Sequence, residues 1–176
     1  MKTLLTIAAA LIAAASCGRQ PPAPSNSSEA EIRLHLDRWA GAFHDRDIDR
    51  IMAVYASGAD LTAYDIAPPL EYTGSDAYRG SYENFLALFD GPIQVEFRDL
   101  RIVAGTDVAF IHTLEHMSGP MTGGEQFDLW MRVTSGLRKI NGEWRIEHDH
   151  VSIPTDFQTG KSVMDLVPPT KSVTPP

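Results

Sequence analysis

The sequence predicts an α+β fold in which three N-terminal helices pack on a curved, mainly antiparallel sheet. Apolar residues recur every three or four positions between Ile32 and Phe89, which is typical of amphipathic helices. From Ile93 onward they alternate with polar residues, as in strands, and Asn141-Gly142 marks a hairpin between two of these runs. Helices followed by strands in one chain indicate an α+β arrangement.

The composition fits one globular domain. The chain has 176 residues, of which 43% are hydrophobic and 22% charged. Its 15 Lys and Arg against 23 Asp and Glu give a formal charge of −8, so its field repels phosphate backbones. We therefore expect no nucleic-acid partner. A single cysteine, Cys17, excludes an intramolecular disulfide and a cysteine metal cluster.

Residues 1–17 are typical of a bacterial export signal. Met1 and Lys2 begin it, an apolar run over residues 4–15 follows, and small residues precede Cys17. The run is shorter than the about 20 residues that a membrane span needs. The segment resembles a lipoprotein signal, so we expect an exported protein of the cell envelope that is anchored only through a lipidated Cys17, on the periplasmic side or the outer surface. The alternative is plain secretion with a free thiol.

Low-complexity segments flank the predicted domain. Residues 18–28 are rich in proline and serine and predict a flexible tether, so the domain is expected to span residues 29–160. The proline-rich residues 161–176 predict a tail that is draped on the surface or frayed.

Three helices are expected within the first half of the domain. Ser28 and Glu31 form a capping box for the first, and Asp47 caps a second, shorter helix, so the two form a hairpin. Ser75 can cap the third, which stops at Gly91-Pro92. Their apolar stripes comprise Ile32, Leu36, Trp39 and Phe43, then Ile48, Ile51, Met52 and Tyr55, then Tyr78, Tyr82, Phe85, Leu86 and Phe89.

The strands begin with a short extended segment from Leu61 to Asp65, which Pro68-Pro69 closes. Longer alternating runs follow around residues 93–97 and 108–116, and then over residues 127–139 and 144–152. These four runs form the main part of the expected sheet.

Alternation also predicts which polar side chains face inward. His148 and His150 occupy the same alternate positions as Trp144 and Ile146, so both histidines are expected to point to the core.

The two preceding strands place further polar residues beside apolar ones. His112 and His116 share a face with Phe110, and Arg132 shares one with Trp130. Both faces of the long strand are apolar while one layer of helices covers a single face, so we expect a homodimer.

The order of these elements and several local motifs resemble SnoaL-like and ketosteroid-isomerase-like proteins of the nuclear-transport-factor-2-like superfamily. The similarity extends over about residues 29–160. The matching segments are Tyr55-Ala56, Tyr64-Asp65, Pro69-Leu70, Gly74 and residues 130–134, 141–146 and 148–152.

This resemblance implies a cone-shaped domain with an apolar pocket and a few polar groups. Enzymes on this scaffold shift protons or eliminate water from apolar substrates, and the resemblance implies neither a metal nor an organic cofactor. It places Asp65 near the base of the isomerase, Trp39 where a donor tyrosine stands, and Met131 or a neighbour where a protonated aspartate stands.

Asp65 and His148 are the candidate catalytic residues. Partial burial beside Tyr64 would raise the pKa of Asp65 and make it a proton acceptor, whereas the alternative is a carboxylate that satisfies backbone donors in the next turn. His148 and His150 are either proton-exchanging ligand contacts or core histidines, and with a carboxylate they would also fit a two-histidine metal site, which we do not adopt.

Arg132 is expensive to bury without a partner. We expect either an internal ion pair, with Asp65 or Glu115, or a contact with a ligand oxygen. The remaining candidate ligand-binding residues are Tyr64, Trp39, Trp130, His112 and His150.

Three functions remain open because one fold serves many activities. The first is an envelope-tethered domain that binds a small apolar molecule in the pocket. The second is a cofactor-free isomerase, dehydratase or cyclase in which Asp65 or His148 moves the proton. The third is a structural dimerisation module.

Overall fold

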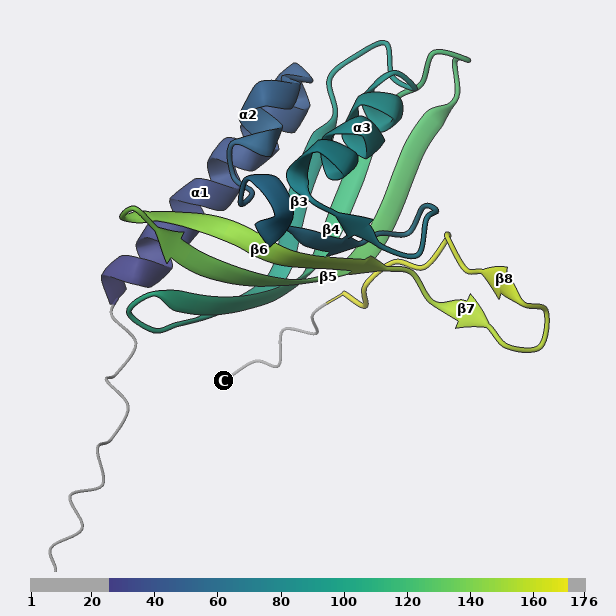
Figure 1. Ribbon diagram of the computed structural model, residues 1–176. Coiled ribbons are helices and arrows are strands. Elements are labelled where there is room, and N and C mark those ends of the chain that lie inside the picture. The colour runs from purple at the N-terminus through teal and green to yellow at the C-terminus, as the bar shows by residue number, and fades with distance from the viewer. Residues whose placement is uncertain (1–25, 171–176) are drawn as a thin grey trace, which may run out of the picture.

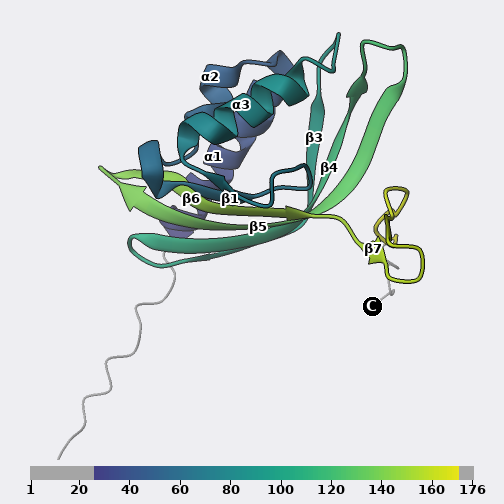
Figure 2. The ribbon, with the colours of Figure 1, turned by 45° about the vertical axis from the view of Figure 1, so that its right-hand side comes forward.

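The computed structural model describes residues 26–170, in which three helices lie on one side of a bent sheet (Figure 1, Figure 2). The helices are α1 (Asn26–Asp45), α2 (Ile48–Met52) and α3 (Ser75–Leu86). The main sheet contains β1 (Thr62–Tyr64), β2 (Tyr72–Thr73), β3 (Gln94–Ala104), β4 (Val108–Pro120), β5 (Gln126–Ile140) and β6 (Glu143–Ser152). This arrangement confirms the predicted fold class. Within the described range, no helix has the length and apolar character to cross a membrane.

The six strands lie in the order β2-β1-β6-β5-β4-β3. β1 runs parallel to β6, whereas the other neighbours are antiparallel. The long strands β4 and β5 bend sharply, so that the sheet curls around the helices (Figure 2). Asn141 and Gly142 have φ values of 52° and 86°, which is the geometry of the predicted hairpin turn between β5 and β6.

α1 begins earlier than the sequence suggests. Residues 26–28, which were expected to belong to the tether, are helical, and Ser28 is buried inside the helix rather than capping it. Cys17, residues 18–25 of the tether and residues 171–176 of the tail lie outside the described residues.

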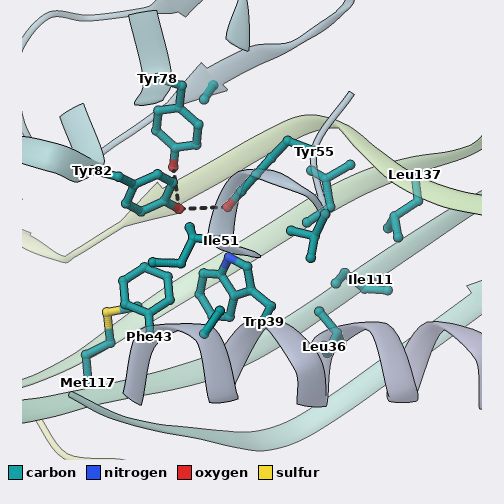
Figure 3. Close-up of a cluster of buried hydrophobic side chains, with 14 of the residues drawn as sticks. Leu36, Trp39, Phe43, Ile51, Tyr55, Tyr78, Tyr82, Ile111, Met117 and Leu137 are labelled. Carbon is teal, nitrogen blue, oxygen red and sulfur yellow. Dashed lines mark hydrogen bonds between the residues drawn. The ribbon is translucent and has the colours of Figure 1, made fainter. Parts of the chain in front are cut away.

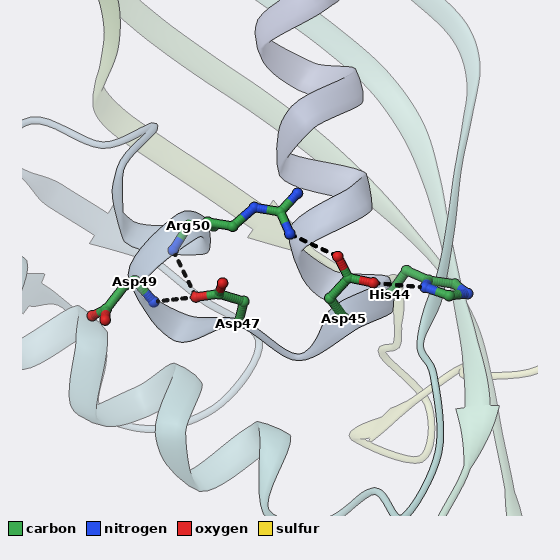
Figure 4. Close-up of polar contacts among 5 residues, drawn as sticks. All are labelled: His44, Asp45, Asp47, Asp49 and Arg50. Atoms are coloured by element: carbon green, nitrogen blue, oxygen red, sulfur yellow. Dashed lines mark hydrogen bonds and ion pairs between the residues drawn. The ribbon is translucent and has the colours of Figure 1, made fainter.

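The turn between α1 and α2 is held by the predicted cap (Figure 4). Asp47 Oδ1 accepts hydrogen bonds of 3.1 Å from the backbone N–H groups of Asp49 and Arg50. Arg50 Nη1 also pairs with Asp45 Oδ2 at 2.6 Å, although an exposed pair of this kind stabilises the fold little. The cap is present as predicted and helps to hold the turn of the helical hairpin.

The core lies between the helices and the inner face of the sheet (Figure 3). The predicted stripe of α1 is buried, and α3 contributes Tyr78 and Tyr82. Trp39 and Phe43 pack at 4.6 Å between ring centroids, and Phe43 meets Tyr82 edge to face at 5.4 Å. The sheet adds Ile111, Met117, Leu129 and Leu137.

A β-bulge in β6 overturns the predicted orientation of its histidines. Gly136 pairs with His148 while the next residue of β5, Leu137, pairs with Ile146, so Glu147 is the extra residue. The alternation reverses at this point. Trp144 and Ile146 are buried as expected, but further along it is Asp149 that is buried, and His148 and His150 lie on the outer face.

The outer face of the sheet also carries the candidate site residues of β4 and β5. His112 and Arg132 are exposed, as is the neighbouring Phe110. Trp130 is half-buried, and its ring stacks on that of His116 at 4.6 Å between centroids. The expectation that these polar groups lie among core residues is therefore wrong, because their shared face is the one that the helices do not cover.

The end of the described part of the tail contacts this outer face. After the small hairpin of β7 (Thr155–Asp156) and β8 (Lys161–Ser162), the backbone N–H of Val163 donates to Pro154 O at 2.9 Å. Arg98 Nη2 then donates to Pro169 O at 2.8 Å. The tail thus contacts the sheet near β3.

Candidate functional site

A cavity of about 800 Å³ lies between α3, the inner face of β4 to β6 and the loop over residues 65–69. Its volume is in the range of small-molecule sites. Its walls are mostly apolar and aromatic: Trp39, Tyr72, Tyr78, Tyr82, Phe85, Met117, Phe127, Leu129, Met131, Val133 and Val151.

Strand alternation and helical spacing place these side chains. Tyr78, Tyr82 and Phe85 recur at spacings of four and three on α3, so they point to the same side. On the sheet, Met131 lies opposite Glu115 and Val133 lies opposite Thr113, all on the inner face. The geometry of helix and sheet therefore produces an apolar chamber with few polar groups.

Three carboxyl groups from different segments line the chamber: Asp65, Glu115 and Asp149. Among the described residues that line it, none is Lys, Arg or His. The chamber therefore contains acidic groups without a basic counterpart.

Glu115 is the most strongly perturbed of the three. It is 4% exposed, and among the described residues its carboxyl makes no hydrogen bond or ion pair. Burial, followed by repulsion from Asp149 and Asp65, raises its pKa to about 8, so the carboxyl is mostly protonated at neutral pH.

Asp149 is equally buried but has hydrogen-bond donors. Its Oδ1 accepts from Ser135 Oγ at 2.6 Å, and its Oδ2 accepts from the Tyr55 hydroxyl at 3.2 Å. Burial raises its pKa to about 6, although these two donors act in the opposite direction. Asp149 can therefore exchange a proton near neutral pH.

Asp65 lies at the rim of the chamber. Burial raises the pKa of its carboxyl, while the backbone N–H of Ile66, which donates to Oδ1 at 2.6 Å, and the Tyr78 hydroxyl counteract the increase. Asp65 satisfies a backbone donor and also faces the cavity, so its role as a proton acceptor stays a prediction.

A small recess of about 20 Å³ adjoins the deep end of the chamber. Trp39, Glu115, Val133 and Asp149 line both spaces. The indole N–H of Trp39 is buried and has no hydrogen-bond partner among the described residues. Such a volume accommodates about one small polar group.

The structure separates the residues that the sequence predicts as site residues. Trp39 and Asp65 line the chamber, whereas Tyr64 and His150 line only an adjoining open groove of about 480 Å³, which shares Asp65 with the chamber. His148 Nδ1 lies 3.0 Å from Thr62 O, and its ring meets Tyr64 edge to face.

Trp130, Arg132 and His112 do not line the chamber. Arg132 is exposed, and the proposed ion pair with Asp65 or Glu115 is wrong because Arg132 lies on the opposite face from Glu115. Within the described residues, no three His, Cys, Asp or Glu side chains come together as metal ligands.

Two of the carboxyl groups that line the chamber, those of Glu115 and Asp149, were not identified from the sequence. Glu115 occupies the same alternate positions as Ile111 and Met117, so strict alternation would have found it. No such signal exists for Asp149, because the bulge at Glu147 reverses its face.

Comparison with known proteins agrees with the fold. A sequence model of the SnoaL-like domain family matches residues 32–156. An NTF2-like protein of unknown function from Pseudomonas putida KT2440 is 35% identical, covers 82% of this chain and 99% of its own, and superposes with a TM-score of 0.74. No protein in the curated comparison set matches significantly.

More distant structures share the fold. An NTF2-like superfamily protein from Salmonella enterica serovar Typhimurium LT2 is 17% identical, covers 79% of this chain and 100% of its own, and has a TM-score of 0.67. A protein from Streptomyces avermitilis, named as a candidate dehydratase of the NTF2-like family, is 15% identical, covers 72% of this chain and 96% of its own, and has a TM-score of 0.63.

The buried Glu115 predicts a specific pH dependence of stability. The folded protein keeps a proton that the unfolded chain releases above its ordinary pKa of 4.5, so the free energy of unfolding falls as the pH rises towards about 8. Glu115→Gln removes this loss. We expect urea unfolding to show the variant close to wild type at pH 5 and more stable at pH 8.5, by on the order of 3 kcal/mol.

Glu125→Gln, on an exposed loop residue, is the matched control and should follow wild type at both pH values. If Glu115→Gln kept the wild-type pH dependence, the buried, proton-retaining state of Glu115 would be ruled out.

Proposed function

The chain belongs to the SnoaL-like domain family, and we propose that it binds a small, largely apolar, uncharged molecule in the chamber. The observation that carries this proposal is the recess at the deep end, which is lined by Trp39, whose indole N–H has no partner among the described residues, and by Glu115, whose carboxyl has none either.

The charge of the chamber selects against anions. Asp65, Glu115 and Asp149 face it, and no basic side chain among the described lining residues offsets them. A carboxylate or phosphate would lose its hydration and meet like charge. A neutral ligand avoids both penalties.

The hydrogen-bond donors at the recess indicate which polar group the ligand carries. The Trp39 indole can only donate a hydrogen bond, and Glu115, protonated at neutral pH, also has a proton to donate. Two donors without acceptors favour a ligand oxygen, as in a ketone, directed at the recess.

A pair of matched probes tests this proposal. We expect wild type to bind 2-acetylnaphthalene, a neutral ketone, at least ten times more tightly than 2-naphthoate, as measured by calorimetry. Glu115→Leu should weaken ketone binding about tenfold, the value of one hydrogen bond, whereas Glu115→Gln, which keeps a donor, should weaken it less.

Arg132→Ala provides the control, because this exposed side chain lies on the opposite face of the sheet and should leave binding unchanged. Equal affinity for the ketone and the carboxylate would overturn the proposed selectivity, and binding of neither would overturn the proposed function.

A second candidate function is cofactor-free proton transfer, as in an isomerase, dehydratase or cyclase. Two chamber carboxyls with raised pKa values favour it, Asp65 at the rim and Asp149 at the deep end. The sequence-based alternative His148 lies outside the chamber, so Asp149 takes its place. The structural neighbour named as a candidate dehydratase is consistent with this chemistry.

Exchange of ketone α-hydrogens separates binding from catalysis. If a carboxylate acts as base, wild type should accelerate deuterium exchange at the methyl group of 2-acetylnaphthalene in D₂O, followed by NMR. Asp149→Asn should slow this exchange by about 10² or more, and Asp65→Asn should also reduce it. If the ketone bound but its exchange were not accelerated, the binding function would stand and the proposed proton transfer would be contradicted.

We also propose that the protein is exported, anchored through Cys17 and dimeric through the outer face of its sheet. The dimer rests on the exposed Val103, Val108 and Phe110 on the outer face, which further along β5 also carries Arg132 and the half-buried Trp130. Aromatic and arginine side chains are enriched in protein interfaces. A dimer that bound none of the probes would favour the structural module instead.

Native mass spectrometry of the protein extracted from its own envelope tests these proposals together. We expect a dimer whose subunits begin at Cys17 and carry acyl chains, which Cys17→Ser should lack. Phe110→Asp should give monomers, whereas Leu34→Asp, at an exposed position on α1, should not. A wild-type monomer would contradict the interface, and an unacylated Cys17 would contradict the anchor.

A further inference from the structure

The buried hydroxyl groups of Tyr55, Tyr82 and Tyr78 form a hydrogen-bonded chain (Figure 3). The Tyr55 hydroxyl lies 3.2 Å from Asp149 Oδ2 and 2.7 Å from the Tyr82 hydroxyl. The Tyr82 hydroxyl lies 3.2 Å from that of Tyr78, which in turn interacts with the Asp65 carboxyl. Three tyrosines therefore link two carboxyl groups.

The fold fixes this chain. Tyr78 and Tyr82 are one turn apart on α3, and Tyr55 follows α2. All three are at most 8% exposed, and their rings pack on one another at centroid distances of 4.6 to 6.0 Å. Burial raises the pKa of each tyrosine well above its usual value, so the hydroxyls stay neutral.

The chain has one proton too few when both carboxyls are ionised. Three hydrogen bonds run from Asp149 through the tyrosines to Tyr78, and the Tyr78 hydroxyl interacts in addition with the Asp65 carboxyl, so four interactions share only three hydroxyl protons. If Tyr55 donates to Asp149, Tyr82 to Tyr78, and Tyr78 to Asp65, the 2.7 Å contact between Tyr55 and Tyr82 has no proton. One additional proton on either carboxyl supplies all four contacts.

We propose that Asp149 and Asp65 act as one proton acceptor, which stores a single proton and passes it between the deep end and the rim through Tyr55, Tyr82 and Tyr78. The coupling exists without any ligand, and only its use in a reaction rests on the proposed function.

Each transfer balances. Once protonated, Asp149 donates its proton to the Tyr55 oxygen, and Tyr55 passes its own proton to Tyr82. Tyr82 and then Tyr78 do the same, and Asp65 receives the last proton. Every tyrosine ends neutral, Asp149 is again ionised, and the proton has reached the rim.

Other groups near the chain also affect Asp149. Ser135 donates to its Oδ1, and the positive form of His148 lowers its pKa, whereas Glu115 on β4 repels it when both are ionised. None of these groups connects Asp149 to Asp65, so removing a middle hydroxyl tests the chain itself.

Carbon-13 NMR of the aspartate carboxyl groups in the ligand-free protein provides the test. In wild type, we expect the Asp149 and Asp65 signals each to show two transitions between pH 3 and 9, with shared midpoints, as coupled sites do. In Tyr82→Phe, which keeps the ring but removes the central hydroxyl, each signal should show one transition with its own midpoint.

Tyr72→Phe is the matched control, because Tyr72 also lines the chamber but donates to Pro68 O at 2.6 Å, outside the chain. It should keep the shared transitions. Tyr78→Phe replaces Tyr82→Phe if the latter does not fold, and it should also separate the two midpoints.

Independent single transitions in wild type would overturn the proposal. Shared transitions that persist in the folded phenylalanine variant would overturn it as well, since the coupling would then act through space. Because no ligand is present, neither result depends on whether the chamber binds the ketone.

Discussion

Side chains of a β-strand alternate between the two faces of its sheet, and one extra residue at Glu147 reverses that alternation along the second half of β6. Before the bulge, Trp144 and Ile146 belong to the core, and after it Asp149 does. The bulge therefore decides that a carboxylate, rather than an imidazole, faces the chamber. The geometry of the recess and of the tyrosine chain depends on this one residue.

The chamber shows how a largely apolar wall changes the behaviour of acidic groups. Glu115 receives no donor among the described residues and is held protonated by burial, whereas Asp149 has two donors and titrates closer to neutrality. For Asp65 at the rim, burial raises the pKa, and hydrogen bonds from the backbone and from Tyr78 counteract the increase. One cavity thus holds acids in different protonation states because their hydrogen-bond partners differ.

Much of the fold follows from local patterns in the sequence. The stripe of α1, the Asp47 cap and the Asn141-Gly142 turn are each determined by neighbouring residues, and all three are present. The site is less predictable because it depends on long-range packing. Asp65 and Trp39 were identified and Glu115 could have been, but the bulge arises from pairing between β5 and β6 and leaves no signal in the spacing of Asp149. The same bulge explains why the predicted inward orientation of His148 and His150 is wrong.

The three tryptophans occupy three separate environments, and this distribution has an optical consequence. Trp39 borders the chamber and its recess, Trp130 stacks on His116 on the outer face, and Trp144 donates to Glu31 Oε2 at 3.0 Å near the start of α1. Fluorescence from proteins that retain one of the three would distinguish events in the chamber, on the outer face of the sheet and at the contact between β6 and α1. The molecule thus contains built-in reporters for its interior and its exterior.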